Sequence, residues 1–188
     1  EGYSPALWKQ MADLGWLGLA IPSEYGGEGA ELLDQAVLFE ELGRALVPGP
    51  LLVSSAFAVQ AILQAGDSTQ KSFLLPGMAR GDIVVTTHLG EPGAQAQIHD
   101  GAEGSGHVLD GTILFVPYAH VANYLLCVAD TPGPGSGTLF LVDAGNPGVR
   151  LSLLESIAGY KQHEVGLQQV KVASDAVLGQ VGGAVEAL

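Results

Sequence analysis

The sequence of 188 residues contains a single cysteine, Cys127. One cysteine cannot form a disulfide within the chain, which excludes a fold held together by disulfides. The scarcity of cysteine is also typical of proteins in the reducing cytosol, so we expect a cytoplasmic location. Since Cys127 lies in the apolar run 124–129, we expect it to be a buried thiol of the core.

Basic residues are also scarce: 7 lysines and arginines stand against 20 aspartates and glutamates, which gives a formal net charge of −13. A protein that binds nucleic acid neutralises phosphates with a basic surface, so this composition argues against that class of partner. The acidic residues are scattered along the chain, and we expect them to form a solvated surface that favours solubility.

No apolar run approaches the roughly 20 residues that a membrane-spanning helix needs, and no signal peptide is visible, so we expect no membrane span. The sequence starts without methionine and stops where a new helix begins, so we expect a fragment, or the ordered part, of a longer chain. The histidines lack the spacing of a metal site, and we expect no metal at His88, His99, His107, His120 or His163.

The first 81 residues show helical periodicity. Leu7, Met11 and Leu14 recur at helical spacing after Ser4-Pro5, a pair suited to the cap and first turn of a helix. A glycine-rich connection, GWLGLAIPSEYGG at 15–27, ends this helix. We place three further helices by their apolar pattern and by their proline and glycine stops, at 32–46, at 51–63, and at 68–75 before Pro76-Gly77.

After Gly81 the sequence changes to short β-like runs separated by turns. The runs are 83–89, then 107–109 and 112–116 around an Asp110-Gly111 hairpin signal, 124–129, 138–142, 149–153 and 165–172. They predict a small antiparallel barrel or sandwich. The expected class is therefore α+β, with a helical domain at 1–81, a β-barrel domain at 82–180 and the start of another helical domain at 181–188.

Together, these segments resemble the acyl-CoA dehydrogenase family. In that family a helical domain and a β-barrel domain precede a C-terminal helical bundle, and the resemblance implies that this bundle is missing from the present sequence. The match extends over nearly the whole chain, in the family's order. It is carried by the segments 7–27, 39–44, 112–123, 139–143, 148–149, 170–172 and 178–179.

The resemblance implies a flavoprotein that oxidises an acyl-CoA thioester. In the family a hydride passes from Cβ of the acyl group to N5 of FAD after removal of the α-proton, and electrons go on to an electron-transfer flavoprotein. The subunits form tetramers, so we expect a homo- or hetero-tetramer, with a role in degrading a fatty acid or a sterol. The few basic residues are poorly suited to the phosphates of CoA.

The first flavin segment of the family is a strand that ends in T-E-P-x-x-G-S-D, and here the matching run at 90–97 reads GEPGAQAQ. The run keeps the family's Glu-Pro-Gly-Ala, whereas Gly90 and Ala96 replace residues with hydroxyl groups. The resemblance assigns cofactor contacts to His88, Leu89, Gly90 and Ala96, and substrate contacts to Glu91, Gly93 and Ala96.

The second flavin segment of the family is W-I-T/S, in which the aromatic ring packs on the flavin and the hydroxyl group hydrogen-bonds to it. Its counterpart here is Phe115-Val116-Pro117, and the resemblance assigns cofactor contacts to all three residues. Phe115 keeps an aromatic face. Pro117 offers neither a hydroxyl group nor a backbone N–H, so this segment has lost hydrogen bonds that the family makes to the flavin.

The family's catalytic base is a glutamate of the C-terminal domain, so no catalytic residue is assigned in this chain. A general base needs a carboxylate within hydrogen-bond reach of the proton, and nothing promotes Glu91 or Glu164 to that role. Three interpretations stay open: an FAD-dependent acyl-CoA dehydrogenase, a flavin-deficient and non-catalytic partner subunit of a heteromeric enzyme, or a module that binds CoA esters without redox activity.

Overall fold

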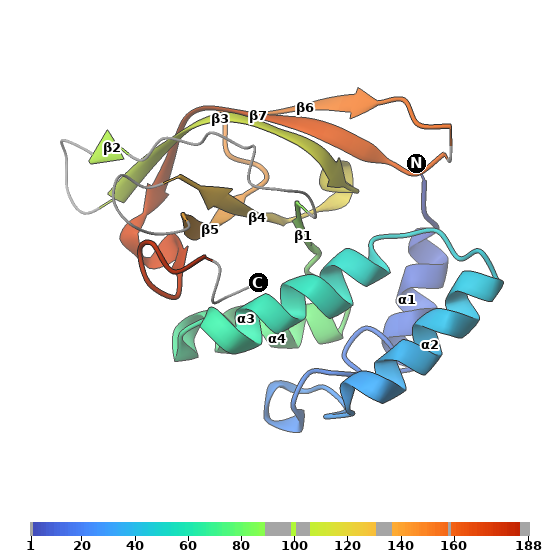
Figure 1. Ribbon diagram of the computed structural model, residues 1–188. Coiled ribbons are helices and arrows are strands. Elements are labelled where there is room, and N and C mark those ends of the chain that lie inside the picture. The colour runs from blue at the N-terminus through green and yellow to red at the C-terminus, as the bar shows by residue number, and fades with distance from the viewer. Residues whose placement is uncertain (1, 89–98, 101–105, 131–136, 158, 185–188) are drawn as a thin grey trace.

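The computed structural model describes residues 2–88, 99–100, 106–130, 137–157 and 159–184. Helices from the first part of the chain lie on one side of a four-stranded sheet, and a second four-stranded sheet covers the other side (Figure 1). Within the described residues, no helix is long and apolar enough to cross a membrane.

The helices begin at the capping residues that the sequence supplies. Ser4 caps α1 (Pro5–Asp13), where its hydroxyl oxygen accepts a hydrogen bond from Leu7 N. Asp67 caps α4 (Ser68–Ala79), and its carboxylate and the side chain of Gln70 form a reciprocal capping box. Between them lie a 3-10 turn (Ser23–Tyr25), α2 (Leu32–Arg44), a π-helix (Leu52–Ala58) and α3 (Val59–Ala65).

The predicted end of α4 at Pro76 was wrong, because the helix continues to Ala79 with the proline inside it. Leu74, Leu75 and Met78 are all buried in the core between the helices and the first sheet. Gln70 also anchors this helix, since its Nε2 donates to the carbonyls of Asp175 at 2.8 Å and Val177 at 2.9 Å. Packing of this face therefore outweighs the hydrogen bond that the proline removes.

The two sheets have the strand orders β1-β4-β5-β8 and β2-β3-β7-β6. All neighbouring strands are antiparallel except β1 and β4, which pair in parallel. The strands are β1 (Val85–Thr87), β2 (His99–Asp100), β3 (Gly106–Pro117), β4 (Tyr124–Ala129), β5 (Thr138–Asp143), β6 (Val149–Leu154), β7 (Gln162–Ala173) and β8 (Val177–Leu178).

Asp110-Gly111 does not form the predicted hairpin, because β3 runs through it as one strand. The strand pairs with β7 on both sides of this point. Between the two paired regions β7 has one more residue than β3, which shifts the register by one. Gln169 of β7 has φ 50° at this bulge, and its backbone N donates to the Asp110 carboxylate at 2.8 Å. The Asp-Gly pair thus accommodates a bulge instead of a turn.

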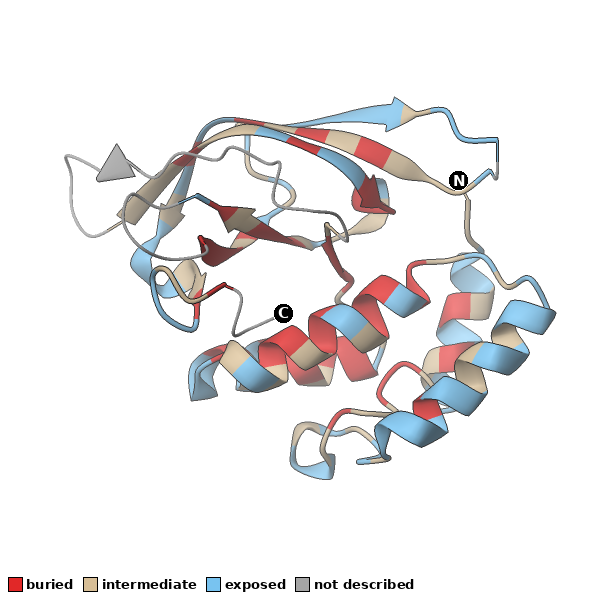
Figure 2. Ribbon diagram, viewed as in Figure 1, coloured by how far each residue is buried: buried red, intermediate tan, exposed pale blue. Residues whose placement is uncertain are grey.

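The inner sheet has two buried faces, and its residues alternate between them. Leu126 and Leu139 face the helices, whereas Leu125, Cys127 and Phe140 face the outer sheet. Figure 2 shows these strands buried and the outer strand β6 largely exposed. The expected class, a helical part followed by a largely antiparallel β part, is confirmed, while the boundaries at residues 81 and 180 stay predictions.

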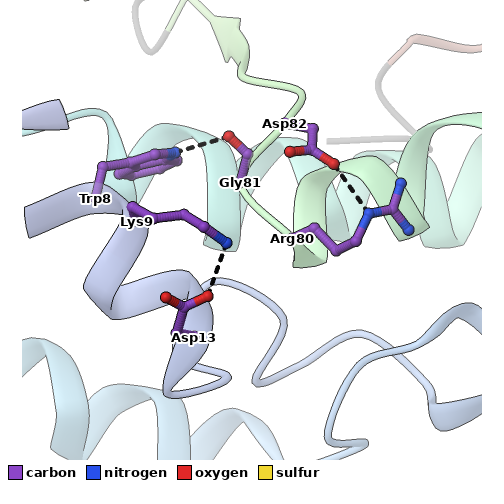
Figure 3. A network of polar contacts seen from close by, with 6 residues as sticks. All are labelled: Trp8, Lys9, Asp13, Arg80, Gly81 and Asp82. Carbon is purple, nitrogen blue, oxygen red and sulfur yellow. Dashed lines mark hydrogen bonds and ion pairs between the residues drawn. The ribbon is translucent and has the colours of Figure 1, made fainter. Parts of the chain in front are cut away.

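A polar contact fixes α1 against the connection between α4 and β1 (Figure 3). Trp8 Nε1 donates to the Gly81 carbonyl at 3.0 Å, and the Trp8 ring is buried with Met11 and Leu17. On either side, Lys9 pairs with Asp13 and Arg80 pairs with Asp82, but both ion pairs are solvent-exposed. Exposed pairs of this kind add little stability, so the Trp8 ring is the main link at this junction.

The glycine-rich connection at 15–27 folds back tightly on itself at Gly27. A Cβ atom placed there would lie 2.2 Å from the Ile21 carbonyl oxygen and 2.5 Å from the Gly18 carbonyl oxygen. No side chain can occupy that space without a movement of the backbone. This connection is therefore scaffold, and its glycine permits a close approach of two chain segments.

Gly27→Ala is expected to lower the free energy of unfolding by about 2 kcal/mol or more, because both nearby atoms are backbone and cannot give way cheaply. Gly43→Ala is the matched control, since Gly43 is exposed near the end of α2 and a Cβ there meets nothing within 4 Å. That variant should gain up to about 1 kcal/mol from helix propensity. Urea denaturation measures both, and equal stabilities of the two variants would contradict the assignment.

Candidate functional site

Strand β1 positions the first predicted flavin segment, because the segment begins where this strand ends. All three residues of β1 are buried, and its parallel pairing with β4 fixes its direction. Val85 N donates to Ser54 Oγ of the π-helix at 3.3 Å, and Thr87 Oγ1 lies 3.3 Å from the Leu126 carbonyl. The strand is thereby held by the π-helix and by its neighbour β4, and Figure 2 shows it buried.

One hydrogen bond brings the two predicted flavin segments together. Thr86 Oγ1 donates to the Pro117 carbonyl at 2.5 Å, in a fully buried position. This bond joins the inner strand β1 to the end of β3 in the outer sheet. His88, the last residue of the first segment that the structure describes, lines an apolar recess with Ile113, Val116, Leu125, Leu126, Cys127 and Val165.

Phe115 lies on a β-bulge that turns its side chain outward. Ile113 pairs with Val165 and Val116 pairs with His163, so β3 has one more residue than β7 between these points. Phe115 has φ 60°, a left-handed conformation that is rare for a bulky residue. Its side chain is 55% exposed and the neighbouring Leu114 is 43% exposed, which creates a small apolar surface at the end of the sheet.

The other two residues of this segment are buried. The side chain of Val116 is 3% exposed and belongs to the core between the sheets, so only its backbone could meet a ligand. Pro117 is also buried, and its carbonyl is engaged by Thr86. Pro117 therefore has no donor to offer a cofactor.

Of the residues predicted to contact cofactor or substrate, the structure brings His88 close to Val116 and places Phe115 on the surface beside them. Leu89, Gly90, Glu91, Gly93 and Ala96 lie outside the described residues. Their assignments stay predictions.

Sequence reasoning missed Tyr118, which directly follows the second segment. Its side chain is 2% exposed, and it too has a left-handed backbone, with φ 51°. Gly49 N donates to its hydroxyl oxygen at 3.0 Å, and its own N donates to the Lys161 carbonyl at 2.7 Å. No signal in the sequence points to this contact, since Gly49 and Tyr118 are far apart along the chain and lie in different parts of the fold.

Two histidines and a second tyrosine form an aromatic cluster with Tyr118, in which His120 and Tyr160 contact Tyr118 and His163 contacts His120. The Tyr118 ring meets Tyr160 edge-on at 5.1 Å and stacks on His120 at 6.4 Å, and the rings of His120 and His163 are 4.8 Å apart. Burial raises the pKa of Tyr118, and the Gly49 N–H opposes this effect only in part. Burial, together with the nearby His120 and Lys161, lowers the pKa of His163.

Metal and thiol chemistry find no support among the described residues. Within these residues, no three histidine, cysteine or acidic side chains gather as they would around a metal ion. Cys127 is buried as expected, and burial raises the pKa of its thiol to about 12. The reactive thiolate is therefore not formed at neutral pH.

Comparison with known proteins agrees with this architecture. Residues 1–82 match the family model of the acyl-CoA dehydrogenase N-terminal domain. Acyl-CoA dehydrogenase FadE12 of Mycobacterium tuberculosis is 28% identical over 200 residues, an alignment that covers 99% of this chain and 51% of that protein. The chain thus spans about half the length of the curated relatives it matches.

Solved structures give the same result for the fold. An acyl-CoA dehydrogenase of Bacillus anthracis complexed with FAD has a TM-score of 0.86 at 27% identity, over 97% of this chain and 34% of that one. The ChsE4-ChsE5 complex of M. tuberculosis gives 0.81 at 25% identity, over 94% and 49%. The chain belongs to the acyl-CoA dehydrogenase family.

Thr86→Val is expected to lower the free energy of unfolding by about 1–3 kcal/mol, because it leaves the buried Pro117 carbonyl without its donor while it preserves side-chain volume. Thr112→Val is the matched control, since it makes the same change at an exposed position of β3. Its effect should stay within about 0.5 kcal/mol. Chemical denaturation of both variants gives the comparison, and equal losses would show that the Thr86 hydroxyl contributes nothing.

The stability of the protein should depend on pH through His163. Its pKa is lower in the folded protein than its ordinary value of 6.5, so the unfolded chain takes up the proton first. The neutral ring therefore contributes stability above about pH 6.5, and this contribution is lost as the pH falls through the folded pKa.

His163→Leu, which cannot titrate, should consequently lose less stability than the wild type between pH 7.5 and pH 5. Carboxylates titrate in both proteins, so the difference between the two curves isolates the histidine. Denaturation at several pH values measures it. Parallel curves would mean that His163 has the same pKa in the folded and unfolded states.

Proposed function

We propose that this chain forms one wall of the FAD site of an acyl-CoA dehydrogenase, an oxidoreductase that acts on the Cα–Cβ bond of an acyl-CoA thioester. The observation that carries the proposal is the bulge that exposes Phe115, two residues before the point where Pro117 is hydrogen-bonded to Thr86 of β1. A protein that needed only a stable sheet would gain nothing from a left-handed phenylalanine at its surface, because that conformation costs free energy. Binding of a planar ligand offers a reason for it.

The residues at this wall fit FAD in part. The exposed ring of Phe115, with Leu114 next to it, is suited to packing against the flat isoalloxazine ring. His88 lies at the end of the buried strand from which the predicted segment 89–97 continues. Pro117 does not fit the family's pattern, because it provides no hydrogen-bond donor at the position where the family uses a hydroxyl group.

FAD, when bound, supplies the acceptor for the hydride that leaves the acyl chain. In this chain Phe115 would pack against it, Thr86 would hold the backbone of the segment in place, and Val116 would exclude water from behind it. We further propose that Glu91, Gly93 and Ala96 contact the acyl-CoA. The proton-abstracting base is expected outside this sequence, in the C-terminal helical domain.

The assembly is part of the proposal. FAD sites of the family are completed by neighbouring subunits, so we propose that the protein works as a tetramer and passes its electrons to an electron-transfer flavoprotein. The FAD-containing structure from B. anthracis, with its TM-score of 0.86, supports the cofactor. The substrate class, whether fatty or steroid-derived, follows from similarity to relatives alone.

A second candidate function is favoured by one observation at Pro117. The proline offers no donor and its carbonyl is bound by Thr86, so this position contributes no hydrogen bond to a flavin. Such a chain would suit the non-catalytic partner subunit of a heteromeric enzyme. Its similarity to the ChsE4-ChsE5 complex supports this alternative, since that structure contains two different chains.

The visible absorption spectrum of the full-length protein, purified alone, separates the two candidates. Near-stoichiometric flavin absorbance supports the autonomous dehydrogenase and excludes the flavin-deficient partner. A colourless protein that gains flavin only when it is co-expressed with a second subunit supports the partner. A protein that acquires flavin under neither condition contradicts both.

Phe115→Ala should weaken FAD binding by about fivefold, because it removes an aromatic contact that contributes on the order of 1 kcal/mol. It should leave the fold intact, since the ring is exposed and alanine removes nothing from the core. Leu33→Ala is the matched control, because Leu33 is an exposed apolar residue of the helix α2. Fluorescence titration with FAD gives both dissociation constants, and a Phe115 variant that binds like the control would remove Phe115 from the site.

A further inference from the structure

Tyr118 lies immediately after the proposed flavin-contacting segment and shares its unusual backbone. Phe115 and Tyr118 both have positive φ values, so two non-glycine residues within four positions adopt a left-handed conformation. Each such residue costs free energy and persists only when its surroundings hold it. The contacts around Tyr118 therefore decide whether the segment keeps its shape.

Three of those contacts come from two parts of the molecule, the connection before β7 and the connection after α2. The Tyr118 backbone N donates to the Lys161 carbonyl, which precedes β7. Its hydroxyl oxygen accepts from Gly49 N in the connection between α2 and the π-helix, at 3.0 Å. Its ring packs edge-on against Tyr160 at 5.1 Å. The side chain thus links the end of β3 to the helical part of the chain.

The contacts of Tyr118 can affect a ligand because Tyr118 directly follows Phe115-Val116-Pro117. On the side of β1, Thr86 donates a hydrogen bond to the Pro117 carbonyl. On the side of the helices, the next residue, Tyr118, is held by the hydrogen bond to its own hydroxyl group. Upstream, Leu114 and Phe115 are exposed between the buried residues Ile113 and Val116, and Phe115 is the more exposed of the two. A backbone fixed at 117 and 118 limits the directions in which the Phe115 side chain can point.

We propose that Tyr118 is a positioning residue for the cofactor: its hydroxyl group, anchored on Gly49, holds Phe115-Val116-Pro117 in the conformation that presents Phe115 to FAD. This inference rests on the proposed function. It predicts that the hydroxyl group of a residue that touches no cofactor nevertheless sets the affinity for FAD.

Tyr118→Phe tests this directly, because it removes the hydroxyl group and keeps the ring in its buried place. Tyr160→Phe makes the same change in the ring that packs against it, and none of the hydrogen bonds that the structure describes involves the Tyr160 hydroxyl. Both variants are made in the full-length protein, together with its second subunit if the wild type needs one to bind flavin.

Two measurements are made on each protein: the dissociation constant for FAD, by fluorescence titration, and the hydrogen exchange of backbone amides, by mass spectrometry. In Tyr118→Phe we expect FAD binding weakened about fivefold, the factor that corresponds to one hydrogen bond. We also expect faster exchange in the peptides that contain 46–50 and 115–118. Tyr160→Phe should match the wild type in both.

The outcomes separate this inference from the proposed function. A wild-type protein that takes up no FAD, alone or with a partner, overturns both. If the wild type binds FAD and Tyr118→Phe keeps the same affinity or the same exchange at 115–118, the positioning role is wrong while the proposed function stands. Faster exchange throughout α4 as well would make Tyr118 a general support of the fold and would equally overturn the inference.

Discussion

The arrangement of the candidate site depends on the hydrogen bond from the Thr86 hydroxyl group to the Pro117 carbonyl. It is the point at which the helix-covered sheet and the outer sheet are joined beside the predicted flavin segments. Strand β1 has only three residues, yet the π-helix, β4 and the end of β3 all contact it through hydrogen bonds. A short strand buried on every side can therefore fix where the segment after His88 begins, and where the bulge at Phe115 stands relative to it.

The same bond limits what Pro117 can offer a ligand. Pro117 has no backbone donor, and its carbonyl accepts a hydrogen bond from the Thr86 hydroxyl group. The segment still presents the exposed aromatic ring of Phe115, a residue with a left-handed backbone. The backbone after Phe115 is held on one side by Thr86 and on the other by the contacts of Tyr118. Affinity for a flavin would then rest on apolar packing and on rigidity, with fewer hydrogen bonds.

The sequence predicted the features that depend on local chemistry. Ser4 caps its helix as expected, and β4 spans Tyr124–Ala129, the run at 124–129 that was predicted to be a strand. It failed where tertiary packing outweighs local preference, at Pro76 inside α4 and at the Asp110-Gly111 bulge. The link between Tyr118 and Gly49 could not be predicted, because it depends on how two distant parts of the chain pack. Family resemblance indicated Phe115 as a candidate, whereas its exposure on a bulge came only from the structure.

The most direct test of this account is a structure of the full-length protein, with its second subunit if one is required, in the presence of FAD. The account predicts that the Phe115 ring lies in van der Waals contact with the isoalloxazine ring, with the Thr86–Pro117 hydrogen bond intact behind it. FAD bound with its ring system away from the end of β3, or Phe115 folded back into the core, would contradict it.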